Sequence, residues 1–212
     1  MKNIPVFTTP YGTASLILRE IPYKQEAYVR VLASDDVVSL LEECKKFCVM
    51  VGAEHIFATA TEMPADYPLH NQILIMRCDR NFLGEGDAAL WPVQSHTADA
   101  FKKLYNDKIR SVDNASYMDD AQCKEMVKRG DGYFVHKEGK LLGIGRVYGG
   151  ELLWVSSHYP GAGETVVKTL AGALQDESIT LDASSTNRKA INLYERLGFI
   201  IVGEKSRWYR IK

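Results

Sequence analysis

The hydrophobic pattern is clearest near the end of the chain, in the segment NRKAINLYERLGF (187–199). Four of its apolar or aromatic residues recur at helical spacing and share one face: Ala190, Leu193, Tyr194 and Leu197. Asn187 is a suitable N-cap, and Gly198 follows the last helical residue, where a left-handed conformation is favoured. The pattern predicts an amphipathic helix over 188–197 with a tyrosine on its inward face.

The preceding hundred or so residues alternate between short apolar runs and helical patterns. Asp119, with Gln122 three residues later, matches a capping box, and Gly130 is placed to end that helix. Another helix is expected to begin at Thr97 or Asp99, and one more to cover 163–175. Expected strands are 90–93, 132–137, 141–148, 151–156, 179–183, 199–202 and 207–211.

The first 86 residues have their own pattern. Alternating residues predict two strands over 14–21 and 26–33, and Ser34 is placed to cap a helix that runs to Val51. Two further strands are expected at 55–59 and 73–78. Residues 81–87 have a linker-like composition, so the sequence predicts an N-terminal part over 1–86 and a second part over 87–212.

Composition indicates an ordinary globular protein. The formal net charge is -1 and the pI about 6.5, so no general attraction to nucleic acid or to an anionic membrane is expected. No apolar run approaches the roughly 20 residues that span a bilayer. The first twelve residues, MKNIPVFTTPYG, lack the apolar core of a secretory signal, which makes a cytoplasmic location the expectation.

The cysteines and histidines do not predict a metal site. Cys44 and Cys48 lie one helical turn apart, a spacing that suits two metal ligands, but no Cys or His pair accompanies them. Buried reduced thiols are the commoner explanation for such residues. The five histidines are isolated from one another, without an H-x-x-x-H pattern.

A glycine-rich turn marks the segment VSSHYPGAGETVVKTL (155–170). A strand runs into Gly161 and Gly163 and then into a helix, so unpaired amides and the positive end of the helix dipole converge there, as in phosphate sites. Most turns of this kind are only turns, and that reading stays open. The segment matches neither the Walker P-loop nor the Rossmann fingerprint.

The two segments together resemble the signatures of the GNAT superfamily of acyl-CoA-dependent N-acyltransferases. Residues 187–199 are similar to its pattern N-x-x-A-x-x-L-Y-E-x-x-G-F, and residues 155–165 to V-x-P-x-Y-R-G-x-G-x-G/A. The resemblance covers about residues 88–212. It implies an α/β (α+β) fold, with a mixed, mostly antiparallel sheet whose central strands splay apart. The N-terminal order of elements echoes half of that fold and predicts a degenerate GNAT-like half; the alternative is a structural extension that widens the sheet or forms a dimer contact.

The resemblance also implies a site for acetyl-CoA, without a metal. Pantetheine would lie between the strand at 152–155 and the strand at 179–183, and the pyrophosphate would lie on the glycine-rich turn. The implied cofactor-binding residues are Val155, Ser157, Gly161, Ala162, Gly163, Glu164, Thr165 and Asn187. Ser157, Pro160 and Thr165 depart from the family pattern, and Pro160 removes a cation. Asn187 is equally well explained as a helix cap.

Tyr194 is the predicted catalytic residue, because a protonated phenol suits the role of general acid toward the leaving thiolate of coenzyme A. Its alternative is a core aromatic. Glu151 is the candidate general base, although an exposed charge at a strand end explains it as well. Further residues that the resemblance places on the acceptor side are Asp113, Asp119, Asp120, Tyr117 and Trp154, each with a structural explanation.

The sequence thus predicts an N-acetyltransferase that transfers an acetyl group from acetyl-CoA to a primary amine by direct attack. The alternative is a non-catalytic acyl-CoA-binding or regulatory protein, and a third class is a structural or interaction module. Protein N-termini, polyamines, aminoglycosides and small metabolites all remain open as acceptors. Expected partners are a small-molecule or peptide amine and possibly a second copy of the chain, with no nucleic acid or membrane.

Overall fold

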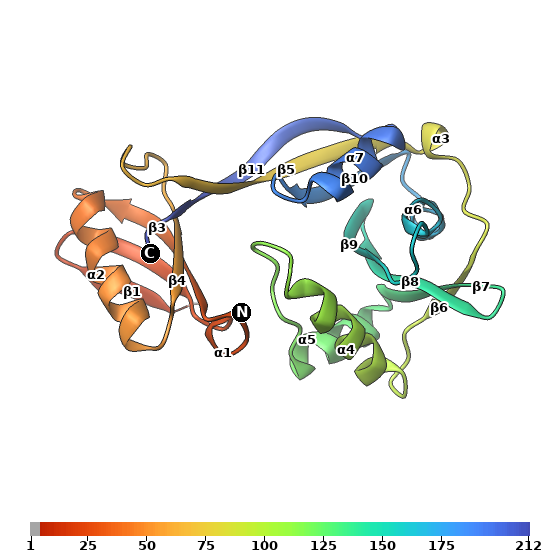
Figure 1. Ribbon diagram of the computed structural model, residues 1–212, viewed down its shortest axis with the longest axis horizontal. Coiled ribbons are helices and arrows are strands. Elements are labelled where there is room, and N and C mark those ends of the chain that lie inside the picture. The colour runs from red at the N-terminus through yellow and green to blue at the C-terminus, as the bar shows by residue number, and fades with distance from the viewer. Residues whose placement is uncertain (1–4) are drawn as a thin grey trace. The chain divides into compact units, whose positions relative to one another are not determined.

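The computed structural model describes residues 5–212. The first four residues, which belong to the segment that lacks a secretory-signal pattern, lie outside the described residues. The chain forms two compact units (Figure 1). The first comprises the chain up to Gln72 together with Ser206–Lys212, and the second comprises Ile73–Lys205. This division differs from the boundary expected between residues 86 and 87, which falls inside the second unit.

The second unit is built on a mixed sheet with the strand order β11-β5-β10-β9-β8-β7-β6. Its strands are β5 (Leu69–Asp79), β6 (Ala89–Pro92), β7 (Gly132–Lys137), β8 (Lys140–Tyr148), β9 (Glu151–Ser157), β10 (Ser178–Ser184) and β11 (Ile200–Arg210). Strands β9 and β10 run parallel, whereas β5 with β10, β6 with β7, β7 with β8 and β8 with β9 are antiparallel. The predicted mixed, mostly antiparallel sheet is confirmed.

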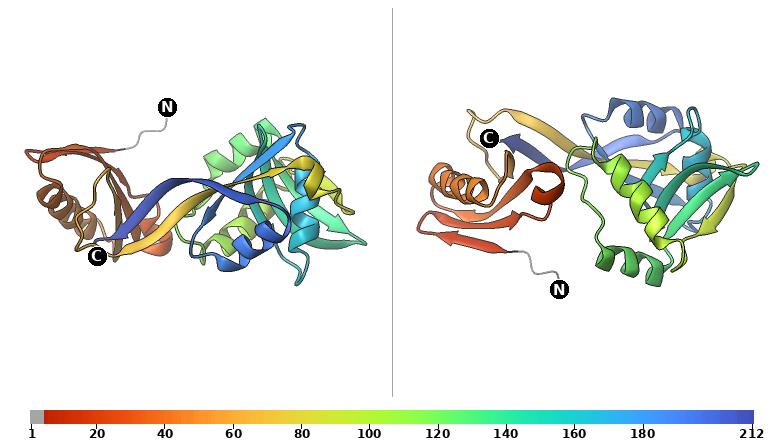
Figure 2. Two further views of the ribbon diagram at one scale, coloured as in Figure 1. Left: turned by 90° about the horizontal axis from the view of Figure 1, so that it is seen from above. Right: turned by 60° about the horizontal axis from the view of Figure 1, so that its bottom comes forward.

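Helices cover both faces of this sheet (Figures 1 and 2). They are α3 (Arg80–Leu83), α4 (Ala98–Ile109), α5 (Asp120–Arg129), α6 (Gly163–Ala171) and α7 (Arg188–Arg196). A Cβ atom at Gly145 of β8 would lie 2.2 Å from Leu170, so α6 packs directly on that backbone. The neighbouring residue Ile144 packs in a cluster with residues of α4 and α5. Because successive strand residues face opposite sides, α6 lies on one face and the α4–α5 pair on the other.

Most predicted elements of the second unit are confirmed within a few residues. The capping box of α5 forms as expected, with the Gln122 amide donating to Asp119 Oδ1 at 2.7 Å and the Asp119 amide donating to Gln122 Oε1 at 3.0 Å. Helix α6 ends at Ala171 and not at residue 175, because Gly172 follows and glycine disfavours helix continuation. Helix α3 was not predicted.

One expectation about the end of the chain was wrong. The two short strands expected at 199–202 and 207–211 are one strand, β11. Its side chains are mostly exposed, so no buried alternation marks the strand in the sequence. Backbone pairing with β5 and β4 holds it extended, and Lys205 forms an ion pair with Asp182 on β10.

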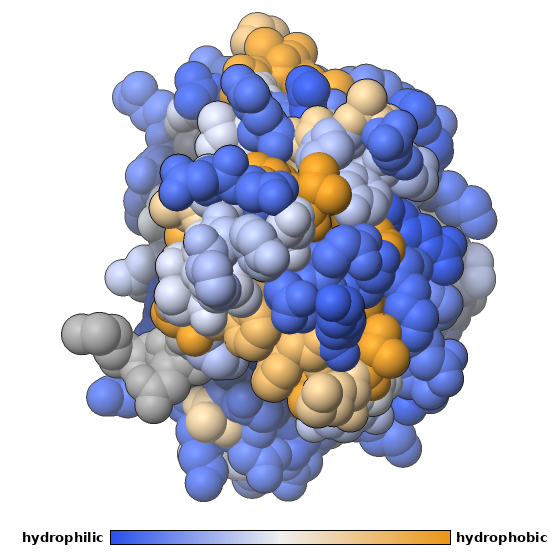
Figure 3. Space-filling model, turned by 90° about the vertical axis from the view of Figure 1, so that its left-hand side faces the viewer, coloured by the Kyte–Doolittle hydropathy of each residue, from blue (hydrophilic) through white to orange (hydrophobic). Residues whose placement is uncertain are grey.

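The first unit has the strand order β1-β2-β3-β4-β11. Its elements are β1 (Val6–Thr9), β2 (Gly12–Ile17), α1 (Ile21–Lys24), β3 (Glu26–Ser34), α2 (Val37–Met50) and β4 (His55–Thr59), of which β1 and α1 were not predicted. Strands β3 and β4 are parallel and α2 connects them, while β2 and β3 are antiparallel. The view in Figure 3, toward the left-hand side of Figure 1, is predominantly hydrophilic, with apolar residues interspersed.

The start of α2 is closed by its own side chain. The N-cap is Asp36 and not the expected Ser34; the Ser39 amide donates to Asp36 Oδ1 at 3.0 Å, and the Ser39 hydroxyl donates to Oδ2 at 2.6 Å. These hydrogen bonds lower the pKa of Asp36, which therefore stays charged at neutral pH. A carboxylate at this helix start disfavours the binding of a phosphate there.

Two absences hold for the part of the chain that the structure describes. No helix in residues 5–212 is long and apolar enough to cross a membrane. Within the same residues, no three or more His, Cys, Asp or Glu side chains gather as metal ligands would.

A buried ion pair generates a stability prediction for the second unit. Asp131 is buried and accepts two hydrogen bonds from the Arg146 guanidinium, at 3.0 and 2.9 Å. Replacing Asp131 with Asn should destabilise the protein by about 3 kcal/mol, because it leaves a half-buried guanidinium without its countercharge. Urea denaturation measures the change.

The matched control is Asp87→Asn, which removes an exposed ion pair with Lys137 and should change the stability little. If Asp131→Asn changes the free energy of unfolding as little as Asp87→Asn does, the Asp131–Arg146 pair does not stabilise the unit.

Candidate active site

The central feature of the second unit is the divergence of β9 from β10. The two parallel strands pair only at Thr180 with Glu151 and at Leu181 with Leu152. Farther along, β9 remains paired with β8 and β10 remains paired with β5, so the two strands separate. Backbone N–H and C=O groups along the facing edges lose their sheet partners, and such groups need replacement partners.

A β-bulge lies where the strands begin to separate. Leu152 pairs with Val147 and Trp154 pairs with Arg146, which leaves Leu153 without a partner on β8. An extra residue of this kind bends its strand and increases the local twist. The bulge therefore turns the second half of β9 away from β10 and helps to keep the gap open.

A cavity of about 350 Å³ occupies this divergence. Its walls come from β9, β10, α7 and the end of α4 with the loop that follows. The lining residues are Lys108, Ser111, Val112, Leu152–Ser157, Leu181–Ser184, Asn187, Ala190 and Tyr194. Four of the predicted catalytic and cofactor-binding residues lie here together: Val155, Ser157, Asn187 and Tyr194.

Tyr194 lines the cavity from α7. The residue is only 8% exposed, and its ring lies 5.8 Å from that of Phe199. Burial raises the pKa of its phenol to about 12, since the charged phenolate is disfavoured away from water. No group in residues 5–212 hydrogen-bonds to its hydroxyl. Tyr194 is therefore a protonated donor at neutral pH.

Asn187 lines the same cavity and also starts α7. Its Oδ1 accepts a hydrogen bond from the Ala190 amide at 3.2 Å, so the predicted cap is formed. Within the described residues, the side-chain NH₂ has no acceptor. The cap uses the oxygen and leaves the two N–H donors for a ligand, so both roles expected of Asn187 are compatible.

The glycine-rich turn follows directly after β9 and leads into α6. Gly161 adopts a φ of 81°, which favours glycine, and a Cβ at Gly163 would lie 2.9 Å from a Leu193 methyl group. Ala162 is the N-cap and supplies no side-chain hydrogen bond. The amides of Gly163, Glu164 and Thr165 consequently have no acceptor among residues 5–212.

The charges around this turn are partly balanced. Glu164 forms an ion pair with Lys168 at 2.7 Å, and this contact lowers the pKa of the Glu164 carboxyl. Lys140 lies 5.5 Å from the centre of the Tyr159 ring. Residues 161–165 do not line the cavity itself but stand at the start of α6, beyond the open end of β9.

Glu151, the candidate general base, also lies away from the cavity. It pairs with Thr180 and Tyr148 at the joined end of β9 and β10, and it is not among the residues that line the cavity. Glu151 thus lies where β9 and β10 are paired, whereas Tyr194 lines the cavity where they diverge.

The acidic residues considered for the acceptor side have structural contacts. Asp119 caps α5 and Asp120 forms an ion pair with Lys102. Asp113 Oδ2 accepts a hydrogen bond from the Thr186 hydroxyl at 2.6 Å. Tyr117 does not line the cavity, whereas Trp154 does.

Sequence reasoning missed Lys108, Ser111 and Val112, which line the cavity from the end of α4 and the next loop. Lys108 is an exposed lysine near a helix end, which usually signifies only a solvated face, and the loop has no periodic pattern. The sequence therefore carried no signal for these three.

The cysteines lie away from this chemistry. All four are free and buried, and none lines the cavity. Burial raises the pKa of the Cys44 thiol to about 12 and that of Cys48 to about 11, so both are protonated and unreactive at neutral pH.

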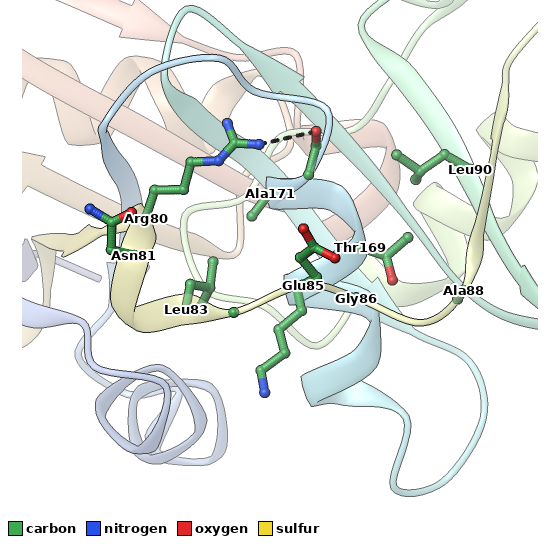
Figure 4. Close-up of a pocket in the computed structure, with 12 residues that line it drawn as sticks. Arg80, Asn81, Leu83, Glu85, Gly86, Ala88, Leu90, Thr169 and Ala171 are labelled. Atoms are coloured by element: carbon green, nitrogen blue, oxygen red, sulfur yellow. Dashed lines mark hydrogen bonds between the residues drawn. The ribbon is translucent and has the colours of Figure 1, made fainter.

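A larger cavity, of about 550 Å³, lies between α6 and the segment that follows α3 (Figure 4). Its cations are already engaged, because Arg80 donates to the carbonyls of Leu174 and Gly172 and Lys168 pairs with Glu164. Gly86 crosses so close to Thr169 that a Cβ there would clash with its backbone. The contacts indicate a role in holding the segment on α6, so the smaller cavity is the candidate site.

No protein-family model and no curated protein matches the sequence. Solved structures do match. A GCN5-related N-acetyltransferase from Anabaena variabilis has a TM-score of 0.61 at 12% identity, over 98% of this chain and 58% of that one. One from Kribbella flavida has a TM-score of 0.59 at 11% identity, over 94% of this chain and 57% of that one. The chain thus spans little more than half the length of these two proteins.

A tandem GNAT protein from the clavulanic acid biosynthesis pathway has a TM-score of 0.53 at 14% identity, over 94% of this chain and 78% of that one. Identities this low establish the fold alone. Together with the splayed strands and the bulge on β9, these likenesses show that the chain has the GNAT fold of the GCN5-related N-acetyltransferases.

Proposed function

We propose that the protein is an N-acetyltransferase that transfers the acetyl group of acetyl-CoA to a primary amine by direct attack. The observation that carries the proposal is the cavity between β9 and β10, where Tyr194 and Asn187 meet the unpaired edges of both strands. The fold alone does not imply activity; the chemistry of these side chains supports it.

The residues present fit the thioester carrier. Unpaired backbone groups of β9 and the free NH₂ of Asn187 would hold the amides of the pantetheine arm. The amides of Gly163, Glu164 and Thr165 would hold the pyrophosphate at the start of α6. Val155, Ser157, Gly161 and Ala162 complete the proposed binding residues.

When bound, acetyl-CoA supplies an acyl carbon activated by its thioester. In the transfer, the amine nitrogen forms a bond to that carbon, the carbon–sulfur bond breaks, and the sulfur leaves with the bonding electrons. Tyr194 holds the proton that the departing sulfur takes, since its phenol stays protonated below its pKa of about 12. The amine gives up a proton to water, which then restores the phenol.

We assign no residue as the general base, because Glu151 lies at the joined end of β9 and β10 and does not line the cavity. The location of this carboxylate and the absence of a cation at Pro160 favour the second candidate, a non-catalytic acyl-CoA-binding protein. A cytoplasmic location and a homodimer stay predictions.

Cofactor binding is tested by thermal shift. Coenzyme A at 100 times its dissociation constant should stabilise the protein by about 2.7 kcal/mol. In Asn187→Ser, the hydroxyl can still cap α7 but the two amide donors are lost. This variant should unfold near the wild-type temperature without ligand and show a smaller shift with it.

An equal shift in wild type and Asn187→Ser would remove Asn187 from the binding site. No shift in the wild type at any cofactor concentration would favour a structural or interaction module.

Catalysis is tested with Tyr194→Phe. Loss of the general acid should lower kcat by about 100-fold to 10,000-fold with little change in KM for acetyl-CoA. The ring remains in place and the hydroxyl has no partner among the described residues, so the fold should persist. Release of free thiol from acetyl-CoA with a panel of amines gives the rates.

An unchanged kcat in Tyr194→Phe would contradict the assigned role. Binding of acetyl-CoA without turnover of any amine would instead support the non-catalytic alternative.

The same residue predicts a pH dependence of stability. An unfolded tyrosine ionises near pH 10 and the buried Tyr194 near pH 12, so its neutral phenol stabilises the fold below about pH 10 and loses this effect as the pH rises through about 12. The wild type should lose stability more steeply than Tyr194→Phe above about pH 10. Urea denaturation at alkaline pH compares them, and parallel losses would contradict the prediction.

A further inference from the structure

Two residues that line the cavity on the side of α4 carry hydrogen-bond donors, Trp154 and Lys108. Trp154 lies on this side, because its ring is 4.8 Å from the ring of Tyr105 on α4. Lys108 follows Tyr105 by three residues on the same helix, so it lies on the same helix face and lines the same cavity. Burial lowers the pKa of His158, which follows directly after β9; the positive charge of Lys108 lowers it further, and the charge of Asp107 opposes the shift.

These donors have no protein acceptors in the described part of the chain. The indole N–H of Trp154 is buried without a hydrogen-bond partner. The ammonium group of Lys108 forms no ion pair within residues 5–212. Lys108 is exposed, so this cost does not apply to it. A buried donor without an acceptor, such as the Trp154 indole N–H, is costly, and such groups in native structures call for an explanation such as a ligand.

Two carboxylates near Lys108, on the cavity wall and in the loop after α4, already have partners. Among residues 5–212, Asp182 is the only acidic residue that lines the cavity, and it forms an ion pair with Lys205. Asp113, in the loop after α4, accepts a hydrogen bond from Thr186. Among the described residues that line the cavity, Lys108 is therefore the charged side chain without an ion-pair partner, and Trp154 lines the same cavity. Asp107, the neighbour of Lys108 in the chain, is exposed and does not line the cavity.

From this arrangement we infer that the acceptor is an amine that also carries a carboxylate, such as an amino acid, and that Lys108 and Trp154 bind its carboxylate. The inference rests on the proposed acetyl transfer. A carboxylate supplies the negative charge and the acceptor oxygens that these donors lack. It separates the acceptor classes left open by the sequence, since polyamines and aminoglycosides would bring like charge next to Lys108.

Lys108 also suits the chemistry of the attack. An amine reacts only as the neutral base, and a positive charge nearby disfavours its protonated form. Lys108 is thus a specificity-determining and positioning residue, whereas Tyr194 remains the residue that faces the leaving group.

The experiment measures thiol release from acetyl-CoA with the common L-amino acids, each paired with its carboxamide, and with spermidine as a polycation. The wild type should use at least one amino acid with a kcat/KM about 10-fold or more above that of its carboxamide. Lys108→Met should abolish this preference mainly through KM for the amino acid, Trp154→Phe should reduce it, and Lys108→Arg should retain most of it.

The matched control is Lys103→Met, which removes an exposed lysine of the same helix that does not line the cavity. This variant should keep the wild-type preference. Equal use of amino acids and carboxamides by the wild type, or faster use of spermidine, would overturn the inference while leaving the acetyl transfer intact. Use of none of these amines would also overturn the inference, and the proposed transfer is then decided by the wider amine panel and by Tyr194→Phe.

Coenzyme A itself carries a 3′-phosphate, an anion that competes with the carboxylate as the proposed partner of Lys108. Affinities for coenzyme A and for its analogue without that phosphate separate the two cases. The inference expects Lys108→Met to bind both as the wild type does. Weakened binding of coenzyme A alone would assign Lys108 to the cofactor and overturn the inference.

Discussion

The structure of the second unit depends on the incomplete pairing of β9 with β10. Two residue pairs join these parallel strands, and beyond them each strand keeps only its outer neighbour. A sheet interrupted in this way loses hydrogen bonds at its centre, where they are otherwise best protected from water. The surrounding layers compensate, because α6 packs on the glycines of β8 and the α4–α5 cluster packs on the opposite face. The gap is thus kept open by well-packed neighbours.

The first unit repeats part of this plan with different chemistry. It too has a parallel strand pair joined by a helix, and β3 carries a bulge at Leu32, where Ala14 pairs with Val31 and Thr13 pairs with Ala33. However, the amide donors at the start of α2 bind Asp36, whereas those at the start of α6 have no side-chain cap. The two units therefore resemble each other in backbone arrangement but not in anion-binding chemistry. This combination is what a degenerate GNAT-like half predicts.

Local patterns in the sequence predicted α7 with its Asn187 cap, the capping box of α5 and the hairpin of β7 and β8, since each depends on residues close together in the chain. They also placed Tyr194 and Asn187 on one predicted helix, and both residues line the same cavity. The pattern failed where long-range pairing decides: β11 is continuous although its side chains are mostly exposed. Lys108 lines the cavity because of how α4 packs, and Glu151 lies outside it because of the register between β9 and β10. Hydrophobic periodicity predicts neither helix packing nor strand register.

The path of β11 has a consequence for the order in which the protein takes shape. Tyr209 and Arg210 pair with β4, so this edge of the first unit stays open until β11 has been synthesised. Nascent chains usually fold from the N-terminal side as they are made. Here β4 must wait for β11, which is made much later, and an exposed strand edge in that interval is a place where another chain can pair.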